Sequence, residues 1–340
     1  MKNMNPRERV LSALRGDRPD YVPASSVTQI GIVEAMERVN AFWPEAHSDP
    51  EQMVRLGVSL YKLVGLETAR IPFCLTVQAE AMGCKIDMGK KDKQPSVVSP
   101  VSLPFEEIHV PEDFINKGRI PVVLKATKII DEQYPDLPNI VGMEGPLTLL
   151  GHIIGVEQLM KMMILNRETL VKLLDVCTEA NIEYAKALLD AGADVITVAD
   201  PTASPELTPP QVFSSMVYPK LKKVAHTIAN KGGTSVLHIC GRTQKILNDM
   251  AETGFDGLSI EEKVDMAEAK EIVGKRARLV GNVSAATTLL SGSPQQVIEE
   301  AKKALQAGVD VLAPGCGLAP HTPLENVKAL VEVALQYGKQ

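Results

Sequence analysis

Three residues with metal-binding side chains follow two apolar, β-branched runs of the chain. His238 and Cys240 follow the run 234–237, and Cys316 follows the run 309–312. Because His238 and Cys240 are two residues apart, extended backbone would point both side chains to the same face. Imidazole and thiolate are ligands that zinc prefers. The set predicts a zinc site with three protein ligands and one open position, as in catalytic rather than structural zinc sites.

An alternative interpretation is a core histidine beside two inert, buried cysteines. Glycine follows both cysteines, at Gly241 and Gly317, and Pro314 precedes Cys316 by two residues. Such backbone suits an open mouth better than a packed core. The glycines therefore favour the metal site.

Composition and charge indicate an ordinary globular protein. The chain has 340 residues, of which 45% are hydrophobic and 23% charged, and a net charge of −6. This balance gives no reason to expect a nucleic acid or an anionic membrane as partner. The polar start lacks the apolar run of a signal peptide, and five widely spaced cysteines suit a reducing compartment. We expect a cytoplasmic enzyme or binding protein that does not span a membrane.

Apolar runs alternate with helical patterns over most of the chain. Strands are expected at 21–25, 68–72, 138–143, 195–199, 235–239, 257–260, 278–282 and 309–313. Eight such units favour a closed barrel over an open doubly wound sheet, and no strand is followed by a glycine-rich dinucleotide fingerprint. We therefore predict an α/β fold, a (β/α)8 TIM-type barrel. It would be one domain over 1–340, with an N-terminal extension and an insertion at about 82–117.

In such a barrel the active-site residues lie at the carboxyl ends of the strands. Nine polar residues stand at or just after these predicted strand ends: Gln29, Arg70, Glu144, Asp200, His238, Cys240, Glu261, Asn282 and Cys316. The imidazole and both thiols of the predicted zinc site are among them. Asp200 and Asn282 are expected to point into the mouth, and the alternative for each is a cap or turn at a strand end.

Several motifs resemble one known family along nearly the whole chain. They lie at 7–10, 27–29, 43–47, 80–84, 94–97, 200–204, 237–241, 281–283 and 313–317. Together they resemble the methylcobamide:coenzyme M methyltransferases of methanogenic archaea, members of the uroporphyrinogen decarboxylase superfamily. The His-x-Cys motif with a distant Cys is similar to the zinc-dependent, thiol-alkylating branch of that superfamily.

The resemblance implies a uroporphyrinogen decarboxylase-like barrel with zinc held by His238, Cys240 and Cys316. It also implies that Glu261 fills the open position before substrate binds; alternatively, Glu261 is a solvated acid at a helix start. The implied reaction, part of methanogenesis from methylated compounds, moves a methyl group from a methyl-Co(III) corrinoid (methylcobamide) to the thiol of coenzyme M. The corrinoid is expected on a separate partner protein that docks on the insertion and on the loops after Asn40 and Pro201.

The substrate side of the site is less defined by sequence. Zinc deprotonates a bound thiol and thereby supplies the nucleophile. Coenzyme M also carries a sulfonate, which Arg70 or the backbone N–H groups of 315–317 could bind. Gln29, Asp200 and Asn282 complete the predicted substrate-binding set.

Four alternatives remain open at this point. A metal-free uroporphyrinogen decarboxylase would use the same barrel but gives the two cysteines no role. A corrinoid carrier without catalysis is disfavoured because the chain has no Asp-x-His-x-x-Gly motif. A structural zinc protein would need a fourth firm ligand. The fourth alternative is a zinc methyltransferase with a different thiol acceptor.

Overall fold

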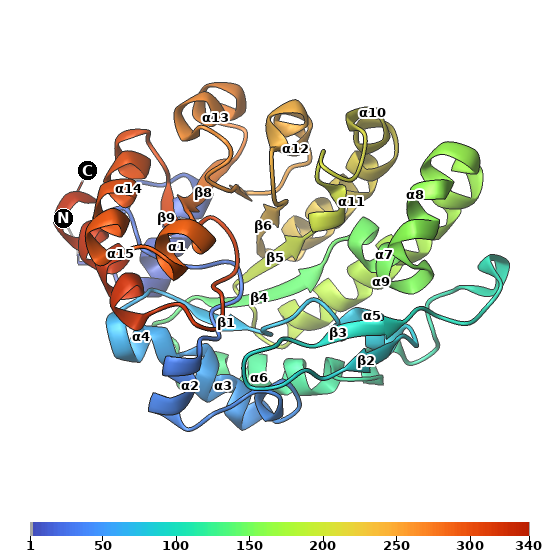
Figure 1. The fold of residues 1–340 in the computed structure, drawn as a ribbon, viewed down its shortest axis with the longest axis horizontal. Helices are drawn as coiled ribbons and strands as arrows, with labels where there is room; N and C mark the ends of the chain where they lie inside the picture. The colour runs from blue at the N-terminus through green and yellow to red at the C-terminus, as the bar shows by residue number, and fades with distance from the viewer. Residues whose placement is uncertain (1–2, 340) are drawn as a thin grey trace.

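Seven parallel strands form one curled sheet in the computed structural model of the protein, which describes residues 3–339 (Figure 1). Their order is β1-β4-β5-β6-β7-β8-β9, so neighbours along the chain are neighbours in the sheet. The strands are β1 (Ala69–Ile71), β4 (Asn139–Glu144), β5 (Val195–Ala199), β6 (Thr234–His238), β7 (Gly257–Ser259), β8 (Arg278–Val283) and β9 (Val311–Pro314). All their carboxyl ends consequently lie at one rim.

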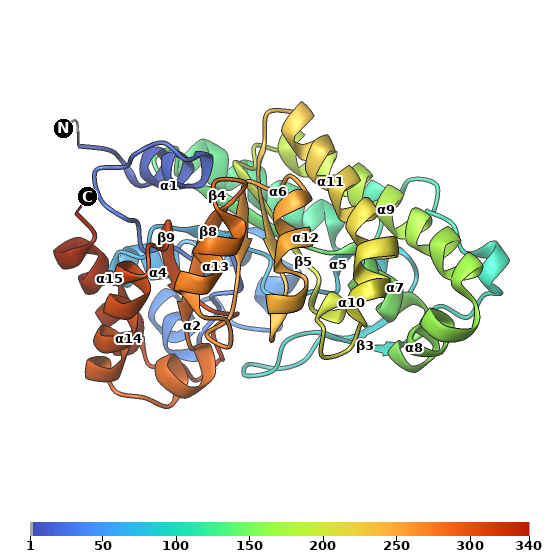
Figure 2. The same cartoon turned by 90° about the horizontal axis from the view of Figure 1, so that it is seen from above.

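Helices surround this sheet and connect its strands (Figures 1 and 2). They are α1 (Pro6–Arg15), α2 (Val33–Val39), α3 (Pro50–Gly57), α4 (Ser59–Val64), α5 (Val77–Ala81), α6 (Ile120–Gln133), α7 (Pro146–Ile154), α8 (Val156–Leu165), α9 (Arg167–Asp190), α10 (Pro210–Val212), α11 (Tyr218–Asn230), α12 (Leu247–Glu252), α13 (Met266–Val273), α14 (Pro294–Gln306) and α15 (Leu324–Tyr337). Between residues 3 and 339 no single helix is long and apolar enough to cross a membrane. Only α7 and α8 taken together, across a bend of 109°, reach that length and hydropathy.

The N-terminal extension closes the amino end of the barrel. Helix α1 begins with a capping box between Asn5 and Glu8, which satisfies two backbone N–H groups of its first turn. Its apolar face, with Val10 and Leu14, joins a buried cluster that includes Val195 and other inward-facing strand residues. The extension is thus part of the barrel core.

The prediction of a strand at 21–25 was wrong, because this segment forms no regular strand. Only Ala24 forms an isolated parallel bridge, to Leu312 of β9. The carbonyl of Pro23 accepts from the N–H of Leu312 at 2.9 Å, and the carbonyl of Ala24 accepts from the N–H of Glu67 at 2.9 Å. Pro23 has no N–H to give to a regular ladder. The segment therefore fills the gap between β9 and β1 by a few irregular bonds rather than as an eighth strand.

The predicted insertion contains an antiparallel hairpin outside the barrel sheet. Its strands are β2 (Lys85–Asp87) and β3 (Ser96–Ser99). After β3, the N–H of Val101 donates to the carbonyl of Ile153 in α7 at 2.9 Å. Buried Cys84 and Ile108 belong to the same hydrophobic core as the barrel helices. From this shared core we infer that insertion and barrel form one domain.

Candidate metal centre

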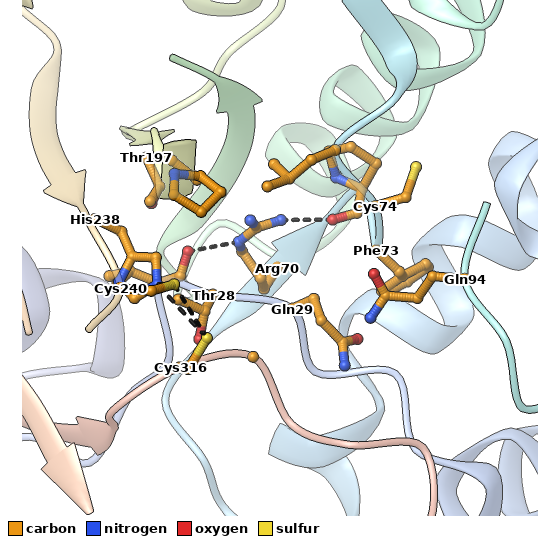
Figure 3. Close-up of a pocket in the computed structure, with 16 residues that line it drawn as sticks. Thr28, Gln29, Arg70, Phe73, Cys74, Gln94, Thr197, His238, Cys240 and Cys316 are labelled. Atoms are coloured by element: carbon orange, nitrogen blue, oxygen red, sulfur yellow. Dashed lines mark hydrogen bonds between the residues drawn. The ribbon is translucent and has the colours of Figure 1, made fainter. Parts of the chain in front are cut away.

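Two neighbouring loops at the carboxyl rim bring the predicted zinc ligands together (Figure 3). His238 is the last residue of β6, Cys240 follows it by two residues, and Cys316 follows the end of β9 by two residues. The Sγ atoms of Cys240 and Cys316 are 3.6 Å apart. His238 Nε2 lies 3.1 Å from the Cys240 Sγ and 3.7 Å from the Cys316 Sγ. Residues from the loops after β6 and β9, with 76 positions between Cys240 and Cys316, thus converge as their types predicted.

The separations of 3.6 and 3.7 Å fit the edges of one tetrahedral metal site, and the separation of 3.1 Å is slightly shorter than such an edge. Ligand bonds of about 2.0–2.3 Å give tetrahedral edges of about 3.3–3.8 Å between nitrogen and sulfur donors. All three donor atoms lie within 4.8 Å of one another, and no other such group of His, Cys, Asp or Glu occurs among residues 3–339. A soft, sulfur-rich donor set of this size suits zinc rather than magnesium or calcium.

The pKa shifts of Cys316 and His238 also indicate that a cation would stabilise the three ligands. The contact with the Cys240 sulfur, and then burial, raise the pKa of the Cys316 thiol well above its ordinary value. Burial works to lower the pKa of His238, but the hydrogen bond and charge of Cys316 outweigh it and raise that pKa. Two thiolates at van der Waals contact repel each other strongly unless a metal ion neutralises them. The residues present therefore fit a bound zinc ion.

His238 is held from its other side by β7. Its Nδ1 lies 3.0 Å from Oγ and 3.3 Å from the carbonyl oxygen of Ser259. Because a carbonyl only accepts, Nδ1 carries the proton and Nε2 turns its lone pair toward the two sulfurs. This is the arrangement that metal-binding histidines commonly show.

Glu261 lies beside the group of three but not in it. Its carboxylate is 3.5 Å from the Lys263 ammonium and its charge contributes to the raised pKa of His238. A Cβ at Gly315 would lie 3.2 Å from the Glu261 Cα, so glycine there lets the β7 loop approach the loop that carries Cys316. The role of Glu261 as a metal ligand stays a prediction.

A cavity of about 200 Å³ opens next to the three ligands, and Arg70 forms part of its wall. The Arg70 guanidinium donates to the backbone carbonyls of Val27, Ile71 and Pro72 at 2.6–2.8 Å. Burial lowers its pKa to about 10, so the group stays charged near neutral pH. No carboxylate of residues 3–339 forms an ion pair with it, and none lines the cavity. The cavity therefore combines metal-binding sulfurs with an uncompensated positive charge.

Gln29 also lines this cavity, and it fixes the loop that carries Cys316. Its side-chain amide donates to the backbone carbonyl of Leu318. In return, the backbone N–H of Leu318 donates to the backbone carbonyl of Gln29 at 3.0 Å. A Cβ at Gly317 would lie 2.9 Å from the Gln29 Cγ. Gln29 thus positions the cysteine loop, whatever it contributes to substrate binding.

Comparison with known proteins places the chain in a family. The uroporphyrinogen decarboxylase (URO-D) family matches residues 5–337. The methylcobamide:CoM methyltransferase MtaA of Methanosarcina barkeri is 51% identical over 340 residues, with 99% of both chains covered. The chain belongs to the methylcobamide:CoM methyltransferases of this family. Methylcobamide:CoM methyltransferase MtbA of Methanosarcina acetivorans is more distant, at 38% identity with 99% of both chains covered.

A solved structure supports the same assignment. A methyltransferase from Methanosarcina mazei superimposes with a TM-score of 0.94 at 50% sequence identity, covering 98% of this chain and 99% of that one. This match confirms the predicted TIM-type barrel of the uroporphyrinogen decarboxylase kind. It also confirms the resemblance that the motifs carried.

Two other predicted site residues of this methyltransferase turn away from the cavity. Asp200 is fully buried and accepts from the Thr148 N–H and hydroxyl at 2.7 Å and from the Leu147 N–H at 3.2 Å, so it caps α7. Asn282 donates to the carbonyls of Glu261 at 3.2 Å and Val264 at 2.9 Å. Neither lines the cavity. Both occupy the cap or loop positions that were the stated alternatives, and their substrate-binding role stays a prediction.

Sequence reasoning missed Cys74, which lines the cavity beyond Arg70. Its Sγ accepts from Arg119 Nη1 and from the Thr76 hydroxyl, both at 3.4 Å. Arg119 in turn pairs with Glu80 at 2.6 Å, so this second buried arginine is compensated. No spacing signal joins Cys74 to Arg119, since 45 residues that include the insertion separate them.

Proposed function

We propose that this protein is a zinc-dependent methyltransferase that moves a methyl group from a methyl-Co(III) corrinoid protein to the thiol of coenzyme M. The observation that carries the proposal is the His238, Cys240 and Cys316 group at the mouth of a chain 51% identical to a methylcobamide:CoM methyltransferase. The products are methyl-coenzyme M and a Co(I) corrinoid. A metal-free decarboxylase would leave this sulfur-rich group without a task.

His238, Cys240 and Cys316 would hold the zinc ion, with Glu261 as the exchangeable fourth ligand. When bound, zinc lowers the pKa of a thiol that coordinates it and so supplies a thiolate near neutral pH. Ser259 keeps the His238 ring in the orientation that offers Nε2, and Gln29 keeps the Cys316 loop in place. Glu261, whose charge contributes to the raised pKa of His238, would receive the thiol proton when it leaves zinc.

The cavity suits a small, anionic thiol. Pockets for drug-sized ligands measure about 300–1,000 Å³, so about 200 Å³ is enough only for a compact molecule. Coenzyme M has two carbons between its thiol and its sulfonate, and the three metal-binding residues and Arg70 line the same cavity. The buried guanidinium of Arg70 would neutralise the sulfonate in a site that excludes water.

The methyl transfer is then a single displacement. The thiolate sulfur forms a bond to the methyl carbon while the cobalt–carbon bond breaks. Both electrons of that bond stay on cobalt, which changes from Co(III) to Co(I). The protein can lower the barrier by positioning, because it holds the sulfur and the methyl group in line.

The corrinoid would come from outside on a partner protein. A corrin ring is far larger than the cavity, and the chain carries no Asp-x-His-x-x-Gly cobalt-binding motif of its own. Free methylcobalamin would reach the same mouth without docking, so we expect it to be accepted as a poorer donor.

Metal analysis combined with turnover tests this function. The purified enzyme should contain about one zinc with a sulfur-rich shell by X-ray absorption, and methylcobalamin with coenzyme M should yield methyl-coenzyme M. Chelator treatment should remove both zinc and activity, and zinc should restore them. A panel of other thiols identifies a different acceptor. Full activity without metal, or no Zn–S scattering, would overturn the proposal.

A further inference from the structure

Exposed large apolar side chains gather on one side of the molecule. Nine such residues are exposed in the described chain, and seven lie on α8, on segment 98–103 or at Leu207. The other two, Leu335 and Tyr337, lie on α15, at the opposite side in both views (Figures 1 and 2). Exposed apolar residues scattered singly are normal, but seven on neighbouring segments form a patch.

Helix α8 is the centre of this patch. Val156, Met160 and Ile164 are 43%, 42% and 77% exposed, and their spacing of four residues places them in one stripe. Another face of the helix, with Leu159, Met162 and Met163, is buried in the core. A helix that is apolar on two faces normally has a partner on both. Within the described chain, α8 has a partner on one face only.

Contacts connect this patch to the metal centre. A Cβ at Gly241, next to Cys240, would lie 3.0 Å from the carboxylate carbon of Glu206, and Leu207 follows directly. Thr208 then reaches the Met163 sulfur of α8 at 4.0 Å. On the other flank, segment 98–103 is bonded to α7 through Val101 and Ile153. All three segments belong to connections that leave the carboxyl ends of β1, β4 and β5, so the patch lies on the side of the barrel that the donor must approach.

We propose that α8 and its flanking segments, the α8 patch, dock the protein that carries the methyl corrinoid. This inference rests on the proposed function, because it requires a protein-bound donor. A donor ring too large for the cavity must be held over the mouth from outside, and the patch is the exposed apolar surface on the same side of the barrel. An exposed ion pair between Glu157 and Lys161, at 2.6 Å, gives the stripe the polar rim that protein interfaces have.

The size of the patch fits a transient partner better than a second copy of this chain. A helix of 10 residues is about 15 Å long. A stable dimer buries roughly 1,200–2,000 Å² in total, more than a single short helix with a few flanking side chains offers. A carrier that must leave after each transfer to be methylated again needs such a small contact.

Single acidic substitutions on the stripe test the inference. I164E and M160E change exposed positions to a good helix former, so the fold is retained. The matched control is L335E, which changes an exposed leucine on α15. Methyl transfer to coenzyme M is measured with two donors: free methylcobalamin, and the corrinoid protein purified from Methanosarcina barkeri by its visible absorbance and then methylated.

We expect the KM for the protein donor to rise at least about tenfold in I164E and M160E, with free methylcobalamin turned over as by the wild type. L335E should match the wild type with both donors. Unchanged kinetics with the protein donor, or equal loss with both donors, would overturn the docking surface. So would a shift of the free enzyme from dimer to monomer in I164E, or loss of wild-type binding to lipid vesicles in that variant. A wild type inactive with both donors would instead overturn the proposed function, and the docking inference with it.

Discussion

Arg9 at the amino end of the barrel and Arg70 at its carboxyl end are both buried, but their surroundings differ. Arg9 pairs with Asp20 at 2.6 Å and with Glu67, and its guanidinium lies 4.0 Å over the Tyr21 ring. Arg70 donates only to backbone carbonyls. The closed end therefore balances its charges within the chain, whereas the open end leaves a positive charge for a ligand to balance.

The same contrast separates the polar groups around the two arginines. At the amino end, Tyr21 donates to Glu67 at 2.7 Å and completes the pairing. At the carboxyl end, the Cys240 and Cys316 sulfurs have only each other and His238 as partners. Internal pairing indicates stability, and groups that lack it at a cavity indicate binding. Each of the following changes tests one side of this comparison.

The largest effect is expected at the open end, from Cys316→Ala. Removal of a metal ligand should lower methyl transfer at least about 100-fold, beyond the 10–100-fold cost of losing a residue that only supports a ligand. The substitution should also reduce bound zinc below one equivalent. Cys84→Ala is the control, because that buried thiol lies outside the cavity and donates to the His152 carbonyl at 3.5 Å. A Cys316→Ala enzyme with full zinc and full turnover would contradict the comparison.

Exchanging each arginine for methionine tests the comparison directly. Arg9→Met leaves Asp20 and Glu67 without their positively charged partner, and should lower the free energy of unfolding by about 3–5 kcal/mol without changing the KM for coenzyme M. Arg70→Met leaves no carboxylate unpaired but removes the donor of three buried backbone carbonyls, so it should also destabilise the fold, by about 1–3 kcal/mol for each carbonyl left without a partner. Its KM for coenzyme M should rise about 10–100-fold.

Urea unfolding and steady-state kinetics measure the two quantities on both variants. Both variants should lose stability, and the comparison predicts that only Arg70→Met also raises the KM for coenzyme M. An unchanged KM in Arg70→Met would assign that arginine to the scaffold.

The sequence predicted the barrel and the convergence of the three zinc ligands for a physical reason. β-Branched runs mark buried parallel strands, and parallel strands of one barrel place their carboxyl ends at one rim. His238, Cys240 and Cys316 follow such ends, so their meeting required no further information. The segment at 21–25 has the same composition but contains Pro23, and its irregular pairing depends on the two strands that it bridges.

The direction of other strand-end side chains could not be predicted in this way. Asp200 follows the end of β5, as Cys240 follows the end of β6. Its side chain turns to the first turn of α7, because the backbone N–H groups of that turn have no acceptor within the helix. Asn282 turns to the carbonyls of the loop after β7. The exposed stripe on α8 could not be predicted from the sequence for a related reason. Its apolar residues occur on both faces of the helix, and only packing shows which face is left uncovered.

A smaller effect is expected from substituting Asp200, whose carboxylate lies at the carboxyl end of the barrel and has hydrogen-bond donors within the chain. Burial raises its pKa from the ordinary 3.8 to about 6, against the lowering effect of the Thr148 bonds. The folded state thus binds the Asp200 proton more tightly than the unfolded state does. This contribution to stability is present below about pH 4, falls as the pH rises, and is lost above about pH 6.

Asp200→Asn should remove that part of the pH dependence, up to about 3 kcal/mol between pH 4 and pH 7. The difference in free energy of unfolding between wild type and variant isolates it, because Glu67 titrates in both proteins. Parallel profiles over this range would show that Asp200 does not hold a proton. An increased KM for coenzyme M in the variant would instead return Asp200 to the substrate site.

The smallest effect is expected from Ser259→Ala, which removes one of two acceptors for His238 Nδ1. The Ser259 carbonyl at 3.3 Å remains, so the ring keeps its orientation less firmly and zinc affinity should fall about tenfold, the lower end of the range for such supporting residues. Competition with a chelator measures this affinity without relying on turnover. Ser235→Ala is the matched control, since this buried serine lies near the opposite end of β6 and bonds to Asp256. Because Ser235 belongs to the closed end, its loss should lower stability and leave zinc affinity unchanged; equal zinc loss in both variants would mean that the two ends are not independent.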